Sequence, residues 1–249
     1  NNTWPLFRAH VEGTRNVCEA ALPHKPEKIV LVSSSGTIAC SHEPVVHDEN
    51  SSYKNDVVGN WPYYLSKIFA EKLAFSYVTR HQLPIVVVNP SLLLGPGDDR
   101  RSSTGDVLLF LRGQIKALPS GGLNFVDVRD AAAGLLGAMR AGRVGQRYLL
   151  GGVNWTFREL LSRLSEISGV AAPRLSLPPR AARIGAGLLR RAYPLLGCRY
   201  ELDDASVQMS SCFWYCDSAK ARRELGFQPR EPLETLRATI EDIRRRLSL

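Results

Sequence analysis

The sequence of 249 residues contains no apolar run of about 18 residues, no internal repeat and no low-complexity linker. Without such a run, no membrane-spanning helix is expected. No secretory signal pattern opens the printed chain, so we expect a cytoplasmic protein. A hydrophobic content of 44% and a charged content of 22% are ordinary for a soluble globular protein. The length suits one large α/β domain, or a domain with a smaller lobe.

Cysteine is scarce, and its distribution argues against a disulfide framework. The five cysteines are an odd number and lie far apart in the chain: Cys18, Cys40, Cys198, Cys212 and Cys216. This pattern is typical of free thiols in a reducing compartment. Cys212 and Cys216 form a lone pair with no second cluster to complete a zinc site, so no metal site is expected.

Positive charge is concentrated in one segment. The formal net charge is +8, and residues 167–200 contain six arginines and no acidic residue. A basic surface of this kind attracts phosphates, nucleic acid or anionic lipid. The segment lacks zinc-finger and helix-turn-helix spacing and interleaved aromatic residues, so no nucleic-acid partner is expected. We favour a solvated helix face near a binding cleft; an anionic-substrate site and membrane-surface docking are the alternatives.

Two periodicities alternate along the chain. Short β-branched runs predict strands over residues 28–32, 83–89, 124–128 and 146–150. Apolar residues at helical spacing predict helices over residues 7–22, 62–80, 104–112, 127–140, 160–167, 178–196, 218–225 and 232–247. A capping box at Thr156 and Glu159 precedes one of these helices. The polar stretch 40–60 is predicted to be a loop, and its length favours a functional role.

Strands separated by helices predict a doubly wound, Rossmann-like α/β fold, in which parallel strands carry helices on both faces. We assign residues 1–150 to this dinucleotide-binding domain, with residues 90–123 contributing to a substrate cleft. Residues 151–249 are expected mainly to form a smaller substrate-binding cap, with a segment packing back on the sheet. Such folds bind ligands at the carboxyl ends of their strands, where Ser34, Asn89 and Pro90 lie.

A tyrosine and a lysine are spaced for proton chemistry. Tyr63 and Lys67 are four residues apart and share one face of a predicted helix. A nearby ammonium favours the phenolate, so Lys67 is expected to lower the pKa of Tyr63. A bare pair is a weak signal, because a buried aromatic beside a snorkelling lysine gives the same spacing. The order of serine strand, tyrosine–lysine helix and Asn-Pro strand end favours the catalytic interpretation.

The strand, G-x-G-x-x-G turn and helix that normally open a dinucleotide-binding fold are absent. The chain begins directly before a helix without an initiator methionine, and a sheet lacking its first strands would expose apolar edges. We therefore expect a fragment that lacks its amino-terminal third or quarter. The alternative is a natural short form that has lost cofactor binding.

Six motifs occur in an order that resembles one family. They cover residues 11–17, 32–37, 63–67, 88–98, 124–131 and 217–227. The chain resembles the extended short-chain dehydrogenases/reductases, within the NAD-dependent epimerase/dehydratase group. It is most similar to the dihydroflavonol-reductase-like branch, which includes hopanoid-associated sugar epimerase-like proteins, and the resemblance runs from about Val11 to Arg245. One departure is His10, where many relatives carry asparagine.

The resemblance implies a role for each matching residue. Tyr63 would be the catalytic acid/base, Lys67 would hold the nicotinamide ribose and tune Tyr63, and Ser34 would bind the substrate oxygen. Ser33 or Ser35 takes the place of Ser34 if the register slips by one. The implied cofactor is NAD or NADP, and the residue that selects between them is not found in this sequence. The segment behind the nicotinamide would consist of Pro90, Ser91, Leu92 and Leu93.

Three functions remain open. The first is an NAD(P)-dependent oxidoreductase acting on a small carbonyl or alcohol, which the serine-rich stretch 33–37 favours. The second is an NAD-dependent epimerase acting on a sugar or nucleotide sugar through the same residues. The third is a noncatalytic binding protein on the same fold. The expected partner is a small-molecule substrate, with a homodimer as an open alternative for the assembly.

Overall fold

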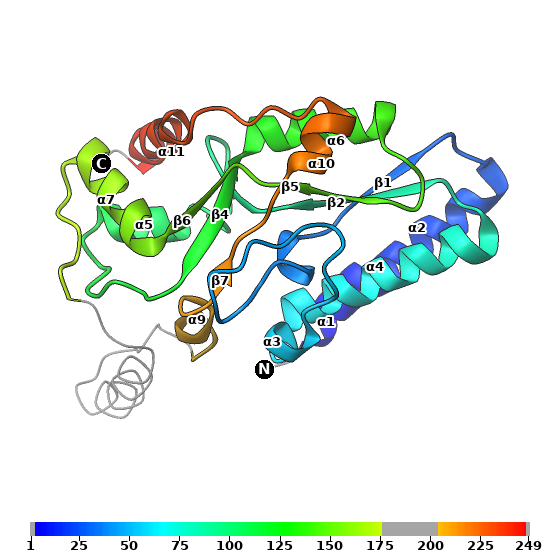
Figure 1. Ribbon diagram of the computed structural model, residues 1–249, viewed down its shortest axis with the longest axis horizontal. Helices are drawn as coiled ribbons and strands as arrows, with labels where there is room; N and C mark the ends of the chain where they lie inside the picture. Colours follow the sequence, from blue (N-terminus) through cyan, green and yellow to red (C-terminus); the bar gives the residue numbers. More distant parts are fainter. Residues whose placement is uncertain (1–2, 176–203, 248–249) are drawn as a thin grey trace.

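The computed structural model describes residues 3–175 and 204–247 of the chain. Within these ranges, seven strands form two sheets that lie side by side in an elongated molecule (Figure 1). The first sheet has the strand order β1–β2–β5, and the second has the order β3–β4–β6, with β7 paired to β4. No helix in the described ranges combines the length and the apolar character needed to cross a bilayer.

The first sheet is entirely parallel. It consists of β1 (Ile29–Val32), β2 (Ile85–Pro90) and β5 (Arg147–Leu150). Every residue of β2 is buried, as expected for a central strand covered on both faces. The registers place Ile29 opposite Ile85 and Val87 opposite Arg147. The carboxyl ends of β1 and β2 therefore lie next to each other.

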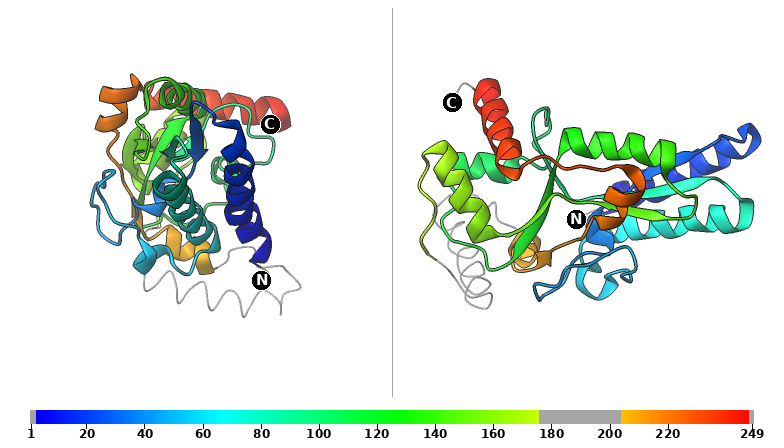
Figure 2. Two further views of the ribbon diagram at one scale, coloured as in Figure 1. Left: turned by 90° about the vertical axis from the view of Figure 1, so that its right-hand side faces the viewer. Right: turned by 45° about the horizontal axis from the view of Figure 1, so that its top comes forward.

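Helices cover both faces of this sheet, because side chains alternate between the faces along each strand. On one face, α2 (Gly13–Ala21) and α4 (Pro62–His81) pack on Ile29 and Ile85. On the other face, α6 (Val128–Ala141) and α10 (Ala219–Leu225) pack on Val86 and other valines. Figures 1 and 2 show α2 alongside α4, on the side of the sheet opposite α6. The doubly wound, Rossmann-like prediction is confirmed.

The second sheet is mixed and was not predicted. It contains β3 (Leu92–Leu94), β4 (Gly122–Asp127), β6 (Val153–Thr156) and β7 (Phe213–Trp214). Strand β4 pairs in parallel with β3 and β7 but antiparallel with β6. Three helices bury a shared apolar core against it: α5 (Gly105–Leu111), α7 (Phe157–Ser168) and α11 (Pro232–Leu247).

The remaining elements are short. The predicted helix 7–22 is a continuous run of α1 (Trp4–Phe7), a π-helical turn η1 (Arg8–Glu12), α2 and a 3-10 turn η2 (Leu22–His24). The predicted loop 40–60 contains one helix, α3 (Asn55–Val58). Two others are the 3-10 turn η3 (Ser35–Thr37) and α9 (Asp204–Met209). The predicted helix 178–196 and most of the arginine-rich segment lie outside the described residues.

Candidate active site

The site begins where β1 and β2 end. The backbone N–H of Ser33 donates to the carbonyl of Val88 at 2.7 Å, which extends the strand pairing by one residue. Asn89 lies beside it on β2 and places its Nδ2 within 3.0 Å of the Ser34 carbonyl oxygen. The chain then turns sharply into η3. These bonds fix Ser34 at the carboxyl end of the sheet, where α/β folds bind their ligands.

The Ser34 side chain is held by the backbone that follows it. Its Oγ accepts a hydrogen bond from the Gly36 N–H at 3.3 Å and caps η3. The hydroxyl hydrogen of Ser34 therefore remains available as a donor to a substrate oxygen. Gly36 lies directly under the Tyr64 ring, since a Cβ built there would stand 2.3 Å from Tyr64 Cε1. We call residues 33–37 the serine loop. Only glycine at position 36 permits this close approach of the serine loop to α4.

Lys67 reaches the same strand end from α4. Its Nζ donates to the carbonyl oxygen of Val32 at 3.1 Å, two residues before Ser34. The same nitrogen lies 6.0 Å from the centre of the Tyr63 ring. Burial lowers the pKa of Lys67, and the nearby Glu71 opposes that shift. The helix thus carries an ammonium group to the end of β1.

Tyr63 lies one turn before Lys67 and is 41% exposed. Its ring packs edge-on against Tyr64, with centroids 5.1 Å apart, and against His10, at 5.6 Å. Burial raises the pKa of the Tyr63 phenol, whereas the sequence predicts that Lys67 lowers it. Burial removes water from the phenol and so disfavours the phenolate, while the Lys67 ammonium is directed to the Val32 carbonyl.

His10 joins the site without having been predicted. Its Nδ1 lies 2.8 Å from the Ser66 hydroxyl, and that hydroxyl donates to the Tyr63 carbonyl at 2.7 Å. Since Ser66 has a single hydroxyl hydrogen, we assign the Nδ1–H tautomer to His10. Burial and then the charge of Lys67 lower the pKa of His10. In the sequence, the only signal was that His10 departs from the asparagine that the family resemblance implies.

Comparison with known proteins identifies the family. Residues 1–151, more than half of the chain, match the model of the NAD dependent epimerase/dehydratase family. This chain belongs to the NAD-dependent epimerase/dehydratase family. The predicted membership in the extended short-chain dehydrogenases/reductases, an enzyme family, is thereby confirmed. The expected cofactor, NAD or NADP, agrees with the description of the family.

Three relatives illustrate the similarity. A protein named "Putative dihydroflavonol 4-reductase" from Synechocystis is 35% identical over 95% of this chain and 69% of its own length. "Sterol demethylase protein B" from Methylococcus capsulatus is 31% identical over 90% and 68%. A solved structure from Pseudomonas aeruginosa, described as a nucleoside-diphosphate-sugar epimerase, has a TM-score of 0.80 at 26% identity, covering 97% of this chain and 74% of its own.

The residues at the end of β2 and just after it show whether the site could hold the family's cofactor. Ser91 is 7% exposed, and its Oγ has no hydrogen-bond partner among the described residues; the same holds for Asn89 Oδ1. Buried polar atoms of this kind normally find a partner, which a carboxamide can provide. Lys67 has further N–H groups beyond the one bonded to Val32. The residues present therefore fit the nicotinamide end of the cofactor. A glycine-rich turn for its phosphates is not found in the sequence.

The four cysteines that the structure describes belong to no metal-binding cluster. Cys18, Cys40, Cys212 and Cys216 are buried free thiols, while Cys198 lies outside the described residues. Across the described ranges, no three His, Cys, Asp or Glu side chains cluster closely enough to hold a metal ion.

Proposed function

We propose that the chain carries the catalytic part of an NAD(P)-dependent oxidoreductase that acts on a small carbonyl or alcohol. Ser34, Tyr63 and Lys67 are its proposed catalytic residues. One observation carries the proposal: Lys67 on α4 donates to the Val32 carbonyl. This bond brings the tyrosine–lysine helix to the strand end that carries Ser34, which is the arrangement that proton transfer to a substrate oxygen requires.

Each of these side chains has a proposed role in carbonyl reduction. The nicotinamide, when bound, supplies a hydride to the carbonyl carbon. The free hydroxyl hydrogen of Ser34 binds the carbonyl oxygen, and Tyr63 gives that oxygen its proton, which completes the alcohol. Water then returns a proton to Tyr63. Lys67 stabilises the phenolate that Tyr63 leaves behind, and alcohol oxidation follows the same steps in reverse.

The nicotinamide half of the cofactor is proposed to lie between α4 and the end of β2. Lys67 and Tyr63 would bind the ribose hydroxyls, and the segment after β2 would line the ring through Pro90, Ser91, Leu92 and Leu93. We also keep residues 1–150 as the proposed cofactor domain, with residues 90–123 in the cleft and residues 151–249 mainly as the cap. The family match, which ends at residue 151, supports that division.

An epimerase is the second candidate, because a structure described as a nucleoside-diphosphate-sugar epimerase shares this fold at 26% identity. An epimerase oxidises its sugar transiently and returns the hydride. The higher identity to the reductase-named relative, 35%, favours the reductase.

Nicotinamide absorbance separates these candidates. The chain is mixed with NADH or NADPH and a panel of aldehydes and ketones, and separately with NAD and nucleotide sugars. We expect net consumption of the reduced nicotinamide with at least one carbonyl compound. Sugar interconversion without net absorbance change would favour the epimerase. A protein without either activity, whose biological effect survives Tyr63→Phe, would be the noncatalytic binding protein.

Assembly and location remain proposals. The four described cysteines are free thiols, which supports a reducing compartment such as the cytoplasm. The homodimer expected as an alternative is tested by light scattering during gel filtration, in which a mass near twice 27.6 kDa supports it.

A further inference from the structure

A carboxylate is buried one helical turn beyond Lys67. Glu71 lies on α4 and is 0% exposed. Burying a carboxylate costs free energy unless other groups bond to it. A leucine would pack the same helix on the sheet without that cost. The hydrogen-bond partners of Glu71 therefore indicate why a carboxylate, and not an apolar side chain, occupies this position.

One oxygen of Glu71 gathers three donors from the strand ends. Its Oε1 accepts from Ser33 Oγ at 2.5 Å, from Asn89 Nδ2 at 2.7 Å and from Thr37 Oγ1 at 2.8 Å. Ser33 and Thr37 enclose the stretch that contains Ser34. Asn89 contacts the Ser34 carbonyl as well. A single atom on α4 thus holds both ends of the serine loop and the neighbouring strand.

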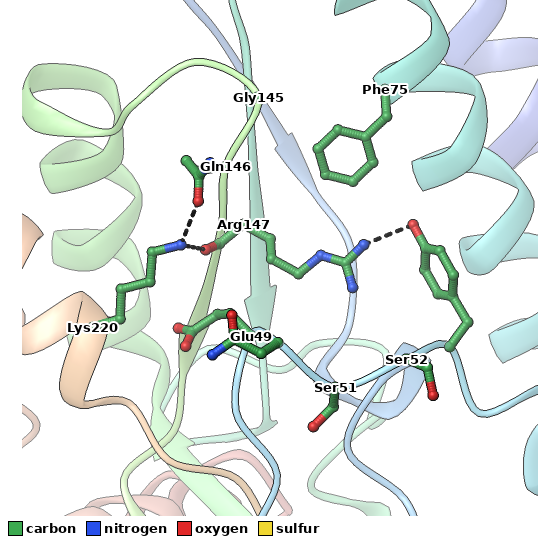
Figure 3. A pocket seen from close by; sticks show the side chains of 10 residues that line it. Glu49, Ser51, Ser52, Phe75, Gly145, Gln146, Arg147 and Lys220 are labelled. Atoms are coloured by element: carbon green, nitrogen blue, oxygen red, sulfur yellow. Dashed lines mark hydrogen bonds between the residues drawn. The ribbon is translucent and has the colours of Figure 1, made fainter.

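The other oxygen faces a cation. Glu71 Oε2 lies 3.4 Å from a guanidinium nitrogen of Arg147 and 3.3 Å from the Tyr53 hydroxyl. The Arg147 side chain is 14% exposed and lines a pocket of about 370 Å³. Figure 3 shows the Arg147 side chain extending into this pocket. Its guanidinium donates a hydrogen bond to the Tyr53 hydroxyl at 2.8 Å. The two carboxylate oxygens therefore have different partners. Oε1 binds the serine loop, and Oε2 faces the positive charge of Arg147.

We propose that Glu71 is a positioning residue, which fixes Ser34 relative to Tyr63 and Lys67 by binding the serine loop to the helix that carries them. The proposal rests on the proposed function for the roles of these three residues. The side-chain hydrogen bonds found for Glu71 among the described residues include none to Tyr63 or Ser34. Glu71 acts instead through Ser33, Thr37 and Asn89. Its loss displaces the serine loop without unfolding the sheet.

Amide hydrogen exchange measures this displacement without any turnover. The Gly36 N–H bonds to Ser34 Oγ, so its exchange rate reports the position of that side chain. The Val87 N–H bonds to the Gln146 carbonyl in the centre of the sheet and serves as the reference for global opening. In Glu71→Leu we expect exchange at Gly36 to rise by about tenfold or more, with a much smaller change at Val87.

Three further variants separate the two carboxylate oxygens. Glu71→Gln keeps a carbonyl oxygen for the three donors, so we expect exchange at Gly36 to stay within about threefold of the wild type. Tyr53→Phe removes a hydroxyl on the Oε2 side and is expected to leave Gly36 unchanged. Ser33→Ala removes one donor on the Oε1 side and is expected to raise Gly36 exchange, which keeps the test possible if Glu71→Leu does not fold.

Steady-state kinetics provide the second measurement, provided that the chain turns over a substrate. Glu71→Leu is expected to lower kcat by about 10- to 100-fold with little change in KM for the reduced nicotinamide cofactor, and Glu71→Gln to recover most of the loss. If Gly36 and Val87 exchange rise together in Glu71→Leu, Glu71 is a stability residue and the proposal is wrong. A chain that binds the nicotinamide cofactor but shows no turnover would reject the proposed function, while the exchange rates would still decide whether Glu71 holds the loop.

Discussion

At the residue scale, Gly36 sets how closely the serine loop approaches α4. A methyl group at this position would stand 2.3 Å and 2.6 Å from two ring carbons of Tyr64. Gly36→Ala must therefore push the loop or the ring aside, at a cost of about 1–3 kcal/mol in the free energy of unfolding. The displaced Ser34 should also lower turnover. Urea denaturation and the nicotinamide assay measure the two effects.

Gly105→Ala is the matched control for Gly36→Ala. No atom lies within 4 Å of the position that the new Cβ would occupy, and Gly105 begins α5. Alanine is favourable in a helix, so we expect no loss of stability. Equal stability of the two alanine variants would show that the contact between Gly36 and Tyr64 does not limit how closely the loop approaches α4.

A second prediction concerns the charge beside Tyr63. Burial, followed by the positive charge of Lys67, lowers the pKa of His10. Lys67→Gln removes the second cause, so the pKa of His10 should rise toward its ordinary value, whereas Lys67→Arg should keep it low. A titration followed by NMR of the His10 ring measures both variants. An unchanged pKa in Lys67→Gln would place the ammonium away from His10 and from the Tyr63 ring.

Spacing and strand order led to the predicted set of Ser34, Tyr63 and Lys67, and the roles of these residues stay a prediction. Tyr63 and Lys67 could be paired because four residues make one helical turn. Ser34 could be placed because it follows a buried strand. The pKa direction of Tyr63 could not be predicted, because it depends on how much water the folded chain removes from the phenol. Glu71 was missed, since its partners on β1, η3 and β2 come together only in the fold.

At the element scale, the loop before α5 is held by one carboxylate. Burial alone would raise the pKa of Asp98, but hydrogen bonds from the backbone N–H groups of Thr104, Ser103 and Ser102 and from the Thr104 hydroxyl hold it at about 2. Its ordinary value is 3.8. The folded state therefore binds the Asp98 proton more weakly than the unfolded state does.

This difference makes stability depend on pH. Because the folded pKa is depressed, the stabilisation is fully present above about pH 4 and is lost as the pH falls toward about 2. Asp98→Asn removes it at every pH. Urea denaturation of both proteins should therefore show a gap in unfolding free energy at neutral pH that closes in acid. A gap of constant size across this window would contradict the assignment.

Helices and strands could be predicted where neighbouring residues in the sequence mark their start or their periodicity. The box of Thr156 and Glu159 predicted the start of α7, and both of its hydrogen bonds are present. Strands β3 and β7 were missed, because runs of three and two residues carry too little periodicity to be recognised. Strand β6 was missed as well, because its four residues are half polar and lead directly into the capping box of α7. They are strands only because β4 pairs with all three.

At the scale of the whole molecule, the predicted parallel sheet and the unpredicted mixed sheet are joined by contacts from distant parts of the chain. Arg230 donates to Asp130 at 2.8 Å and lies 3.6 Å from Asp127, which ties the segment before α11 to the start of α6. Helix α10 packs on the first sheet and α11 on the second. Pairings of this separation leave no local pattern in the sequence, so the second sheet could not be predicted.

The central claim is that the Tyr63 phenol donates the proton at the carboxyl end of this sheet, and Tyr63→Phe tests it most directly against Tyr64→Phe on the same helix. Tyr63→Phe should lower kcat by about 10²- to 10⁴-fold while leaving the free energy of unfolding nearly unchanged. Tyr64→Phe, which keeps the ring that packs on Gly36 and Trp214, should retain near wild-type turnover. Full activity in Tyr63→Phe, or an equal loss in both variants, would contradict the account.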